Sequence, residues 1–254
     1  MLAEQRRLKM LELMREEGSA SVKALSQTFS VSEPTIRQDL EKLETEGFIV
    51  RKHGGAFLKS VPQQVQAMSL EHLENMDKKR IIGRKAAEFV HHGETIILDA
   101  GSTTTEMVDY LAMRQNLKVL TNALNIVLRL GVVPNCTVFA SGGQFKPPTL
   151  SLTGEKAGEF FTDVHASKLF LATGGISFEA GLTYPGLNDL YVKKAMIKAA
   201  KEVILVADST KIGKVSFASL GGLDLIHSFI TDDAIADEDR RRFEDMGVQV
   251  ILAK

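Results

Sequence analysis

The sequence lacks the features that mark secreted, membrane-spanning or disulfide-bonded proteins. It is 254 residues long and contains a single cysteine, Cys136, so an internal disulfide is excluded. No charge-free apolar run is long enough to cross a bilayer. The charged first ten residues lack the apolar core of a secretion signal. We therefore expect a cytoplasmic protein with no membrane partner, in which Cys136, within an apolar run, is a small buried hydrophobe.

An excess of basic charge, which would favour nucleic acid, is also missing. The formal net charge is −1, and the first sixty residues carry ten basic and nine acidic side chains. Hydrophobic residues make up 44% of the chain and charged residues 25%, which is ordinary for a globular protein. A DNA-binding role must therefore rest on where the charges lie rather than on their sum.

Residues 1–58 show the pattern of three helices followed by a hairpin. A first helix is expected at 3–17, and Ser21 and Ser32 are suitable N-caps for the second and third helices. Pro34 is tolerated in the first turn of the third helix, whose apolar residues recur at helical spacing. Strands are expected at 48–51 and 56–58, with a tight turn between them. Two capped helices separated by a few residues favour a helix-turn-helix, and the hairpin would be its wing.

The exposed face of the third helix favours DNA over the alternative, a small three-helix bundle that binds protein. Its side chains can donate to base edges and phosphates, and the hairpin tip adds basic residues. The residues expected to contact DNA are Ser32, Thr35, Arg37, Gln38 and Lys42 in the helix and Arg51, Lys52 and His53 in the wing.

Residues 59–76 read as a linker, and from residue 77 the pattern changes to short apolar strands that alternate with helices. A helix is expected at 77–91. Strands are expected at 95–99, 117–121, 137–140, 168–172, 203–207, 228–231 and 248–252. Near-continuous hydrophobic strands separated by helices predict an α/β domain with a mostly parallel sheet covered on both faces.

Small hydrogen-bonding residues follow five of these strands, at what would be the carboxyl edge of the sheet. Doubly wound folds bind ligands at that edge, and free backbone N–H groups there suit a phosphate. The residues proposed to bind a ligand are Asp99, Gly101, Ser102, Thr103, Thr104, Thr121, Asn122, Gly142, Gly143, Thr173, Gly174 and Lys211. For each there is a structural alternative: the hydroxyls can cap helices, the glycines can serve backbone geometry, and Lys211 can be a solvated lysine.

No motif points to catalysis. The Walker A, GxGxxG and GxSxG patterns are missing, and His91, His92, His165 and His227 lack metal-ligand spacing. Asp99 and Asp208 at strand ends offer acid–base groups, but we expect them to accept ligand hydroxyls or to cap the following turns. We therefore assign no catalytic residue, metal or cofactor.

Several runs resemble the DeoR family of bacterial sugar-metabolism regulators. They are SEPTIRQDL at 32–40, RKHGGA at 51–56, LDAGSTT at 98–104, ATGG at 172–175, VKKAMI at 192–197 and ADSTKIG at 207–213. The resemblance implies a sensor domain similar in fold to ribose-5-phosphate isomerase, phosphorylated sugars as effectors and, for most members, repression.

Two residues depart from the family pattern. Gln38 stands where a second arginine is usual, and Asp189 stands where a glutamate is frequent. If Asp189 contacts the effector, then the effector differs from the commonest ones, and we include Asp189 among the effector-binding residues.

Together these patterns predict a winged helix-turn-helix domain at 1–58, a linker at 59–76 and an α/β effector-sensing domain at 77–254. The expected function is repression of a carbohydrate-utilisation operon, relieved by a phosphorylated sugar or a related metabolite. The expected partners are operator double-stranded DNA, that small effector and further copies of the chain, as a dimer or tetramer, because one winged module makes few base contacts. The alternative is a sugar-phosphate isomerase-like enzyme fused to a DNA-binding module.

Overall fold

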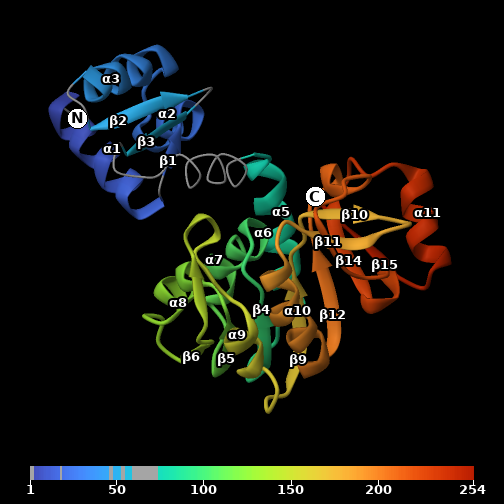
Figure 1. The fold of residues 1–254 in the computed structure, drawn as a ribbon. Helices are drawn as coiled ribbons and strands as arrows, with labels where there is room; N and C mark the ends of the chain where they lie inside the picture. Colours follow the sequence, from blue (N-terminus) through green and yellow to red (C-terminus); the bar gives the residue numbers. More distant parts are fainter. Residues whose placement is uncertain (1–2, 18, 46–47, 53–54, 59–73) are drawn as a thin grey trace. The chain divides into compact units, whose positions relative to one another are not determined.

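The chain divides into two compact units, Met1–Glu74 and Asn75–Lys254, which Figure 1 colours from blue to red along the sequence. The computed structural model describes residues 3–17, 19–45, 48–52, 55–58 and 74–254. Most of the expected linker lies outside these residues, so the domain boundaries at 58 and 76 stay a prediction.

The first unit is a winged helix-turn-helix, as the sequence predicts. Its helices are α1 (Ala3–Glu17), α2 (Val22–Phe29) and α3 (Glu33–Thr45), and its strands are β1 (Ser19–Ser21), β2 (Ile49–Lys52) and β3 (Gly55–Leu58). The strands pair antiparallel in the order β1-β3-β2. Strand β1 was not expected, because its three residues merge with the cap of α2.

Local side-chain contacts explain where the helices of this unit begin and end. The Ala24 N–H donates to Ser21 Oγ over 3.1 Å, which confirms the first expected cap. At the second expected cap, the contact is longer: the Thr35 N–H lies 3.4 Å from Ser32 Oγ. Helix α2 ends at Phe29, and the left-handed backbone of its C-cap Ser30 (φ 52°) turns the chain toward α3. The core holds Met10, Met14, Leu25, Ile36, Leu40, Leu43, Ile49, Ala56 and Phe57, all at most 2% exposed.

The second unit contains a seven-stranded sheet in the order β15-β14-β12-β9-β4-β5-β6. The strands are β4 (Thr95–Leu98), β5 (Leu117–Thr121), β6 (Cys136–Ala140), β9 (Ala166–Leu171), β12 (Ala200–Val206), β14 (Ser228–Asp232) and β15 (Gln249–Ala253). Every neighbouring pair is parallel. The seven expected strands are these seven: β5 has the expected bounds, and the ends of the others differ by at most three residues.

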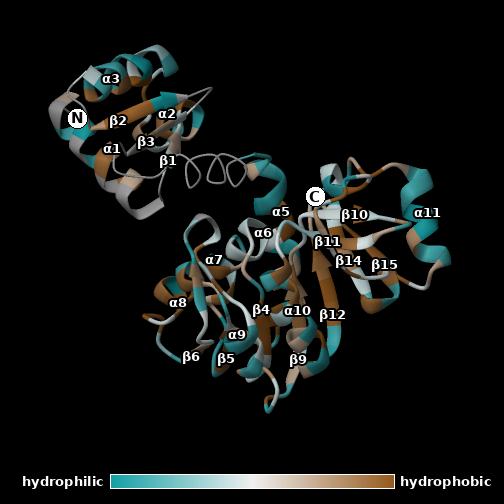
Figure 2. Ribbon diagram, in the orientation of Figure 1, coloured by the Kyte–Doolittle hydropathy of each residue, from teal (hydrophilic) through white to brown (hydrophobic). Residues whose placement is uncertain are grey.

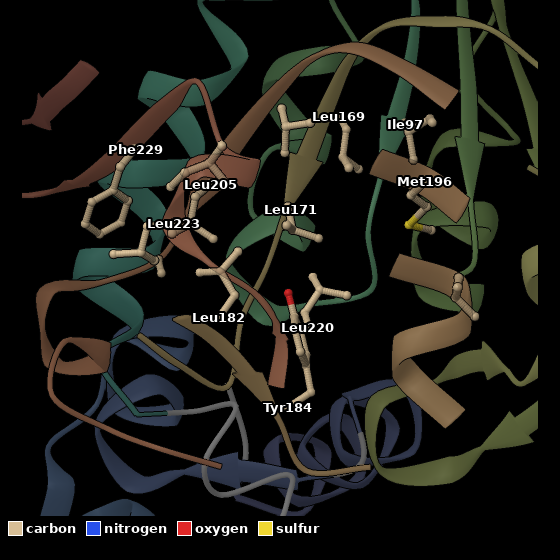
Figure 3. Close-up of a cluster of buried hydrophobic side chains, with 14 of the residues drawn as sticks. Ile97, Leu169, Leu171, Leu182, Tyr184, Met196, Leu205, Leu220, Leu223 and Phe229 are labelled. Carbon is tan, nitrogen blue, oxygen red and sulfur yellow. The ribbon is translucent and has the colours of Figure 1, made fainter. Parts of the chain in front are cut away.

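Helices cover both faces of this sheet, because alternate strand residues point to opposite sides. On one side lie α5 (Met76–Ala87), α6 (Ser102–Thr105), α7 (Val108–Leu111) and α8 (Leu124–Leu130). On the other lie α9 (Glu155–Glu159), α10 (Leu187–Ala199) and α11 (Asp237–Asp245). Figure 3 shows the apolar cluster on the α10 side, where Met196 packs with Ile97 and Leu171.

Two small antiparallel sheets lie beside the α10 face and were not expected. One joins β10 (Gly175–Ser177), β11 (Gly181–Tyr184) and β13 (Ala218–Gly221), and the other is the hairpin of β7 (Gln144–Lys146) and β8 (Ser151–Thr153). The remaining elements are the short helices η1 (Pro147–Thr149), η2 (Ser209–Lys211) and η3 (Leu223–Leu225). These segments are too short to leave a periodic pattern.

The expectation that Cys136 is buried is wrong. Cys136 is only partly buried, because β6 is an edge strand and pairs with β5 alone. Phe139 on the same strand is 45% exposed for the same reason.

Hydrophobic residues concentrate inside the second unit, as Figure 2 shows for β4 and β12, whereas α11 is hydrophilic. Among the described residues, no helix is both long and apolar enough to cross a membrane.

Candidate functional site

Helix α3 presents the predicted DNA-binding residues on its exposed side. Arg37, Gln38 and Lys42 are exposed and Thr35 is half-buried. The Arg37 guanidinium lies 3.2 Å from Glu33 Oε2, one turn earlier on the helix. The arrangement leaves a polar face with donors that can reach base edges.

The wing is attached to α3 through a glutamate side chain. Glu44 Oε1 accepts a hydrogen bond from the Arg51 N–H over 2.9 Å, which fixes the start of the wing against the end of the helix. Lys52 ends β2, but its side chain and all of His53 lie outside the described residues. Glu44 therefore holds the wing against α3, a role that the balance of basic and acidic residues does not indicate.

A buried ion pair inside the first unit was missed by the sequence reasoning. Arg6 of α1 pairs with Asp39 of α3, and their side chains are 9% and 5% exposed. Arg7 adds a 3.4 Å contact to the other oxygen of Asp39. Both arginines were counted above as basic charge, yet they hold α3 against α1. The contact joins residues more than thirty positions apart, so no local pattern signals it.

At the carboxyl edge of the large sheet, Asp99 is fully buried and pairs with Lys193 of α10. Asp99 Oδ2 also accepts the Ala172 N–H over 3.0 Å. Complete burial raises the pKa of Asp99, and the Lys193 ammonium opposes that rise. The Lys193 Nζ lies 4.8 Å from the centre of the Tyr184 ring. Sequence reasoning named Asp99 but not Lys193 as a site residue.

The turn after β4 brings the predicted residues Gly101 to Thr104 next to Asp99. A Cβ on Gly101 would lie 2.4 Å from the Ala172 Cβ, so the close approach requires glycine. Thr104 Oγ1 donates to the carbonyls of Asp99 and Gly101. Thr103 is buried and Ser102 half-buried, at the start of the four-residue helix α6.

Thr121 and Asn122 make hydrogen bonds within the protein. Thr121 Oγ1 donates to the Leu98 carbonyl over 2.6 Å. Asn122 Oδ1 accepts the Ala100 N–H over 2.9 Å, and its Nδ2 donates to the Leu152 carbonyl. Both residues therefore fix the Asp99 turn, and their contact with an effector stays a prediction.

At the ends of β6 and β9, the predicted residues also combine close backbone packing with hydrogen bonds inside the protein. Gly143 has φ +120°, and a Cβ there would lie 2.7 Å from the Thr153 carbonyl oxygen; Gly142 is exposed. Thr173 Oγ1 donates to the Gly175 carbonyl over 2.9 Å, and the Gly174 N–H donates to the Thr183 carbonyl. These four predicted residues lie at the same sheet edge as Asp99.

Asp189, in the first turn of α10, is 9% exposed. Lys146 Nζ of β7 lies 2.8 Å and 3.0 Å from its two carboxylate oxygens. Lys146 was not predicted as a site residue, because nothing in its local sequence sets it apart.

Lys211 ends η2, next to a polar cluster that ties α5 to the ends of β12 and β14. Asp208 caps η2 by accepting the Thr210 N–H over 3.1 Å, which confirms its expected capping role. Lys78 of α5 lies 2.8 Å from Asp232 Oδ1. Burial acts to raise the pKa of Asp232, but hydrogen bonds from Lys78 and Ser209 outweigh it and lower that pKa.

The structure thus brings Asp99 together with Gly101, Thr104, Asn122 and Thr173 at one edge. Asp189 lies on α10, the helix that also carries Lys193, the partner of Asp99. In the described part of the chain, Lys211 makes no hydrogen bond or ion pair with these residues. Among the described residues, no group of three or more His, Cys, Asp or Glu side chains is placed to hold a metal ion.

Comparison with known families places both units. The model of the DeoR-like helix-turn-helix domain matches residues 6–61, and that of the DeoR C-terminal sensor domain matches residues 74–233. The chain belongs to the DeoR family. It is therefore a DNA-binding transcription regulator, with a sensor domain behind the winged helix-turn-helix.

Curated DeoR-type relatives match along nearly the full length. The HTH-type transcriptional regulator GlpR of Haloferax volcanii is 33% identical over 99% of this chain and 98% of its own length. The HTH-type transcriptional repressor GlcR of Bacillus subtilis is 32% identical over 91% and 89%. The glycerol-3-phosphate regulon repressor of Escherichia coli is 29% identical over 90% of each chain.

Solved structures resemble this DeoR-family chain only distantly. Ribose 5-phosphate isomerase A from Neisseria gonorrhoeae covers 54% of this chain and 53% of its own, with 18% identity and a TM-score of 0.39. The eIF2B delta subunit from Chaetomium thermophilum covers 68% and 64%, with 19% identity and a TM-score of 0.44.

Proposed function

We propose that this DeoR-family regulator represses a carbohydrate-utilisation operon and releases its operator when a phosphorylated sugar, or a related metabolite, binds the sensor unit. The observation that carries the proposal is a polar edge of buried charged residues on the same chain as a winged helix-turn-helix. The names of the relatives support it, since they include GlcR, a repressor, and the repressor of a glycerol-3-phosphate regulon.

Operator recognition is assigned to α3 and the wing. Arg37, Gln38 and Lys42 contact base edges or phosphates, and Ser32 and Thr35 at the start of α3 add hydroxyl donors. The basic wing contacts the backbone. The modest charge of the unit fits a reader that places a few donors accurately rather than one that binds DNA by bulk charge.

The phosphate of the effector is assigned to the turn from Gly101 to Thr104 and to Lys211. Ser102 is half-buried, and no hydrogen bond of its hydroxyl to another described residue is found. Lys211 is half-exposed, and no side-chain partner is found for it in the described part of the chain either. The half-exposed Lys211 ammonium and the Ser102 hydroxyl are both suited to a phosphate, which accepts several charge-assisted hydrogen bonds.

The sensor is proposed to bind its ligand without turnover. The acidic groups at the edge, Asp99 and Asp189, are each paired with a lysine, so neither is a free base. The isomerase-like alternative requires a base that can take a proton from carbon. A homo-oligomer, dimer or tetramer, is also proposed, because two DNA-binding heads raise affinity through effective concentration.

A thermal-shift screen of sugar phosphates, followed by a turnover assay on each hit, tests this proposal. A ligand at a hundred times its Kd should add about 2.7 kcal/mol to the free energy of unfolding. Product formation above the uncatalysed rate would favour the enzyme, whereas a set of sugar phosphates that leaves Tm unchanged would remove the proposed effector class.

A further inference from the structure

One edge of the large sheet is uncharged. Strand β6 ends the strand order and pairs with β5 alone, and Figure 1 shows it beside α8 at one end of the second unit's sheet. The sequence holds no charged residue from Leu130 to Phe145. Natural proteins protect a free edge strand with charged residues, with proline or with a covering element. Strand β6 contains neither a charged residue nor a proline.

The backbone of β6 has hydrogen-bonding groups that face away from the sheet. The Ser141 N–H donates to the Thr121 carbonyl over 2.9 Å, so this residue directs its backbone toward β5. Because successive residues of a strand alternate in direction, Val138 and Ala140 direct their N–H and C=O groups away from β5. In the described part of the chain, no strand pairs with this side of β6. The free edge is therefore able to accept one further strand.

Large apolar side chains are exposed around the same edge. Phe139 is 45% exposed, and its neighbour Val138 packs on the α8 side of the sheet, so Phe139 faces the other side. Leu128 of α8 and Val132, in the turn between α8 and β6, are 74% and 81% exposed. Leu150, whose carbonyl accepts a hydrogen bond from the first residue of α8, is 41% exposed. Exposed apolar residues that gather in this way mark interaction sites.

The exposed apolar area is about what a dimer needs. The exposed fractions of these four side chains correspond to somewhat more than two whole side chains, on the order of 400 Å². A standard interface buries about 800 Å² on each partner, and a little more than half of that area is apolar. The backbone and the polar side chains of β6 supply the remainder.

The opposite edge of the sheet differs from β6, because charged residues flank it. Strand β15 contacts α11, in which eight of the nine residues are charged, and Figure 2 shows α11 as hydrophilic. The Lys254 carbonyl, directly after β15, accepts a hydrogen bond from the Arg84 guanidinium. Charges beside an edge strand disfavour its pairing with another strand. Of the two edges, β6 is therefore the one suited to a partner.

We propose that β6 pairs antiparallel with β6 of a second copy of the chain about a two-fold axis, with Phe139 opposite Phe139 of the partner subunit. A two-fold interface brings the same surface of both copies together, and an uncharged strand meets its own copy without repulsion. This inference rests on the homo-oligomer of the proposed function and adds the surface that forms it.

The direction of the backbone groups determines this register. With Phe139 on the axis, Val138 of each copy lies opposite Ala140 of the other, and each of these two pairs exchanges both of its hydrogen bonds. The two copies of Phe139 form the non-hydrogen-bonded pair between them, with Cα atoms about 4.5 Å apart. Aromatic pairs at such positions stabilise a sheet, and this pair covers a side chain that is exposed in the single chain.

Sedimentation velocity on the full-length protein, over a dilution series, tests the surface. Phe139→Lys places two ammonium groups opposite each other, and Ala140→Pro removes an outward N–H while leaving the bonds to β5 intact. Each should raise the Kd for dissociation at least about thirtyfold, the loss expected when a central contact of an interface is removed. Met246→Lys is the matched control, because Met246, at the end of α11, is 46% exposed. It should dissociate like the native chain.

Disulfide cross-linking tests the register, and it does not depend on whether the lysine and proline variants fold. In a chain that also carries Cys136→Ser, Phe139→Cys should form a covalent dimer on oxidation, because Cα atoms about 4.5 Å apart lie within disulfide range. Thr137→Cys in the same background is the control. Thr137 faces the same side of β6, but its two copies would lie about 14 Å apart, so this variant should cross-link far more slowly.

Two results would overturn the inference and leave the proposed homo-oligomer standing. One is a Kd for dissociation close to the native value in both Phe139→Lys and Ala140→Pro. The other is a Phe139→Cys chain that cross-links no faster than the Thr137→Cys chain. A native protein that stays monomeric at micromolar concentration would instead refute the homo-oligomer of the proposed function, and the inference with it.

Discussion

Replacing Arg37 by alanine should weaken operator binding much more than it lowers the stability of the protein. The Arg37 side chain is 60% exposed, and it forms an ion pair with Glu33 on the same helix. An exposed pair of that spacing contributes about 0.3–0.5 kcal/mol, less once salt screens it. An arginine that contacts a base contributes about 1–3 kcal/mol to binding, which corresponds to roughly a 5–150-fold loss of affinity. The binding loss should thus be several times the stability loss.

Fluorescence anisotropy on a duplex from upstream of the protein's own operon measures the binding, and urea unfolding measures the stability. Arg37→Lys is the informative control, because lysine keeps the charge but not the bidentate fork. If Arg37 contacts a base, then lysine should restore little of the preference over random duplex. Operator affinity within twofold of the native value in Arg37→Ala would show that α3 does not read DNA through this residue.

Three further predictions follow from other contacts. Lys211→Ala should bind operator normally but need a much higher effector concentration for release, and unchanged potency in an operator-release titration would move the phosphate site elsewhere. Asp39→Ala should destabilise the first unit by about 3–5 kcal/mol, because it leaves Arg6 buried without its partner; a circular-dichroism urea curve like that of the native protein would contradict this. Because the pKa of Asp232 is lowered in the folded state, its contribution to stability is present above the ordinary carboxylate pKa, about 4, and is lost as pH falls through the lowered value. Lys78→Met should reduce that contribution, so its acid-unfolding midpoint should lie at higher pH, and an unchanged midpoint would refute the linkage.

The parts of the fold that were predicted correctly are those with a strong local signal. Strands such as β4 and β12 are near-continuous apolar runs, because both faces of a parallel sheet are covered. Ser21 marks the start of α2 because its side chain caps a backbone N–H two to three residues later. The three-residue strands β1 and β10 were missed, since no period can be read from so few residues.

The site was only partly predictable for a different reason. Asp99 could be named because it directly follows a strand, whereas its partner Lys193 lies 94 residues away in sequence and becomes visible only when α10 packs on the sheet. Lys146, on the short strand β7, was missed for the same reason, because its partner Asp189 lies 43 residues away in sequence. Asn122 illustrates the reverse: its position at a strand end was correct, but its amide is occupied by Ala100 and Leu152.

The central claim is that one chain reads an operator and releases it on binding a sugar phosphate. The most direct measurement is an operator titration by fluorescence anisotropy, over a salt series, with and without the sugar phosphate that gives the largest thermal shift. We predict that binding depends on salt and prefers the operator over random duplex. The ligand should weaken operator binding by about 5–150-fold, which corresponds to a coupling free energy of about 1–3 kcal/mol. Binding without sequence preference, or operator affinity that the bound ligand leaves unchanged or increases, would contradict the account.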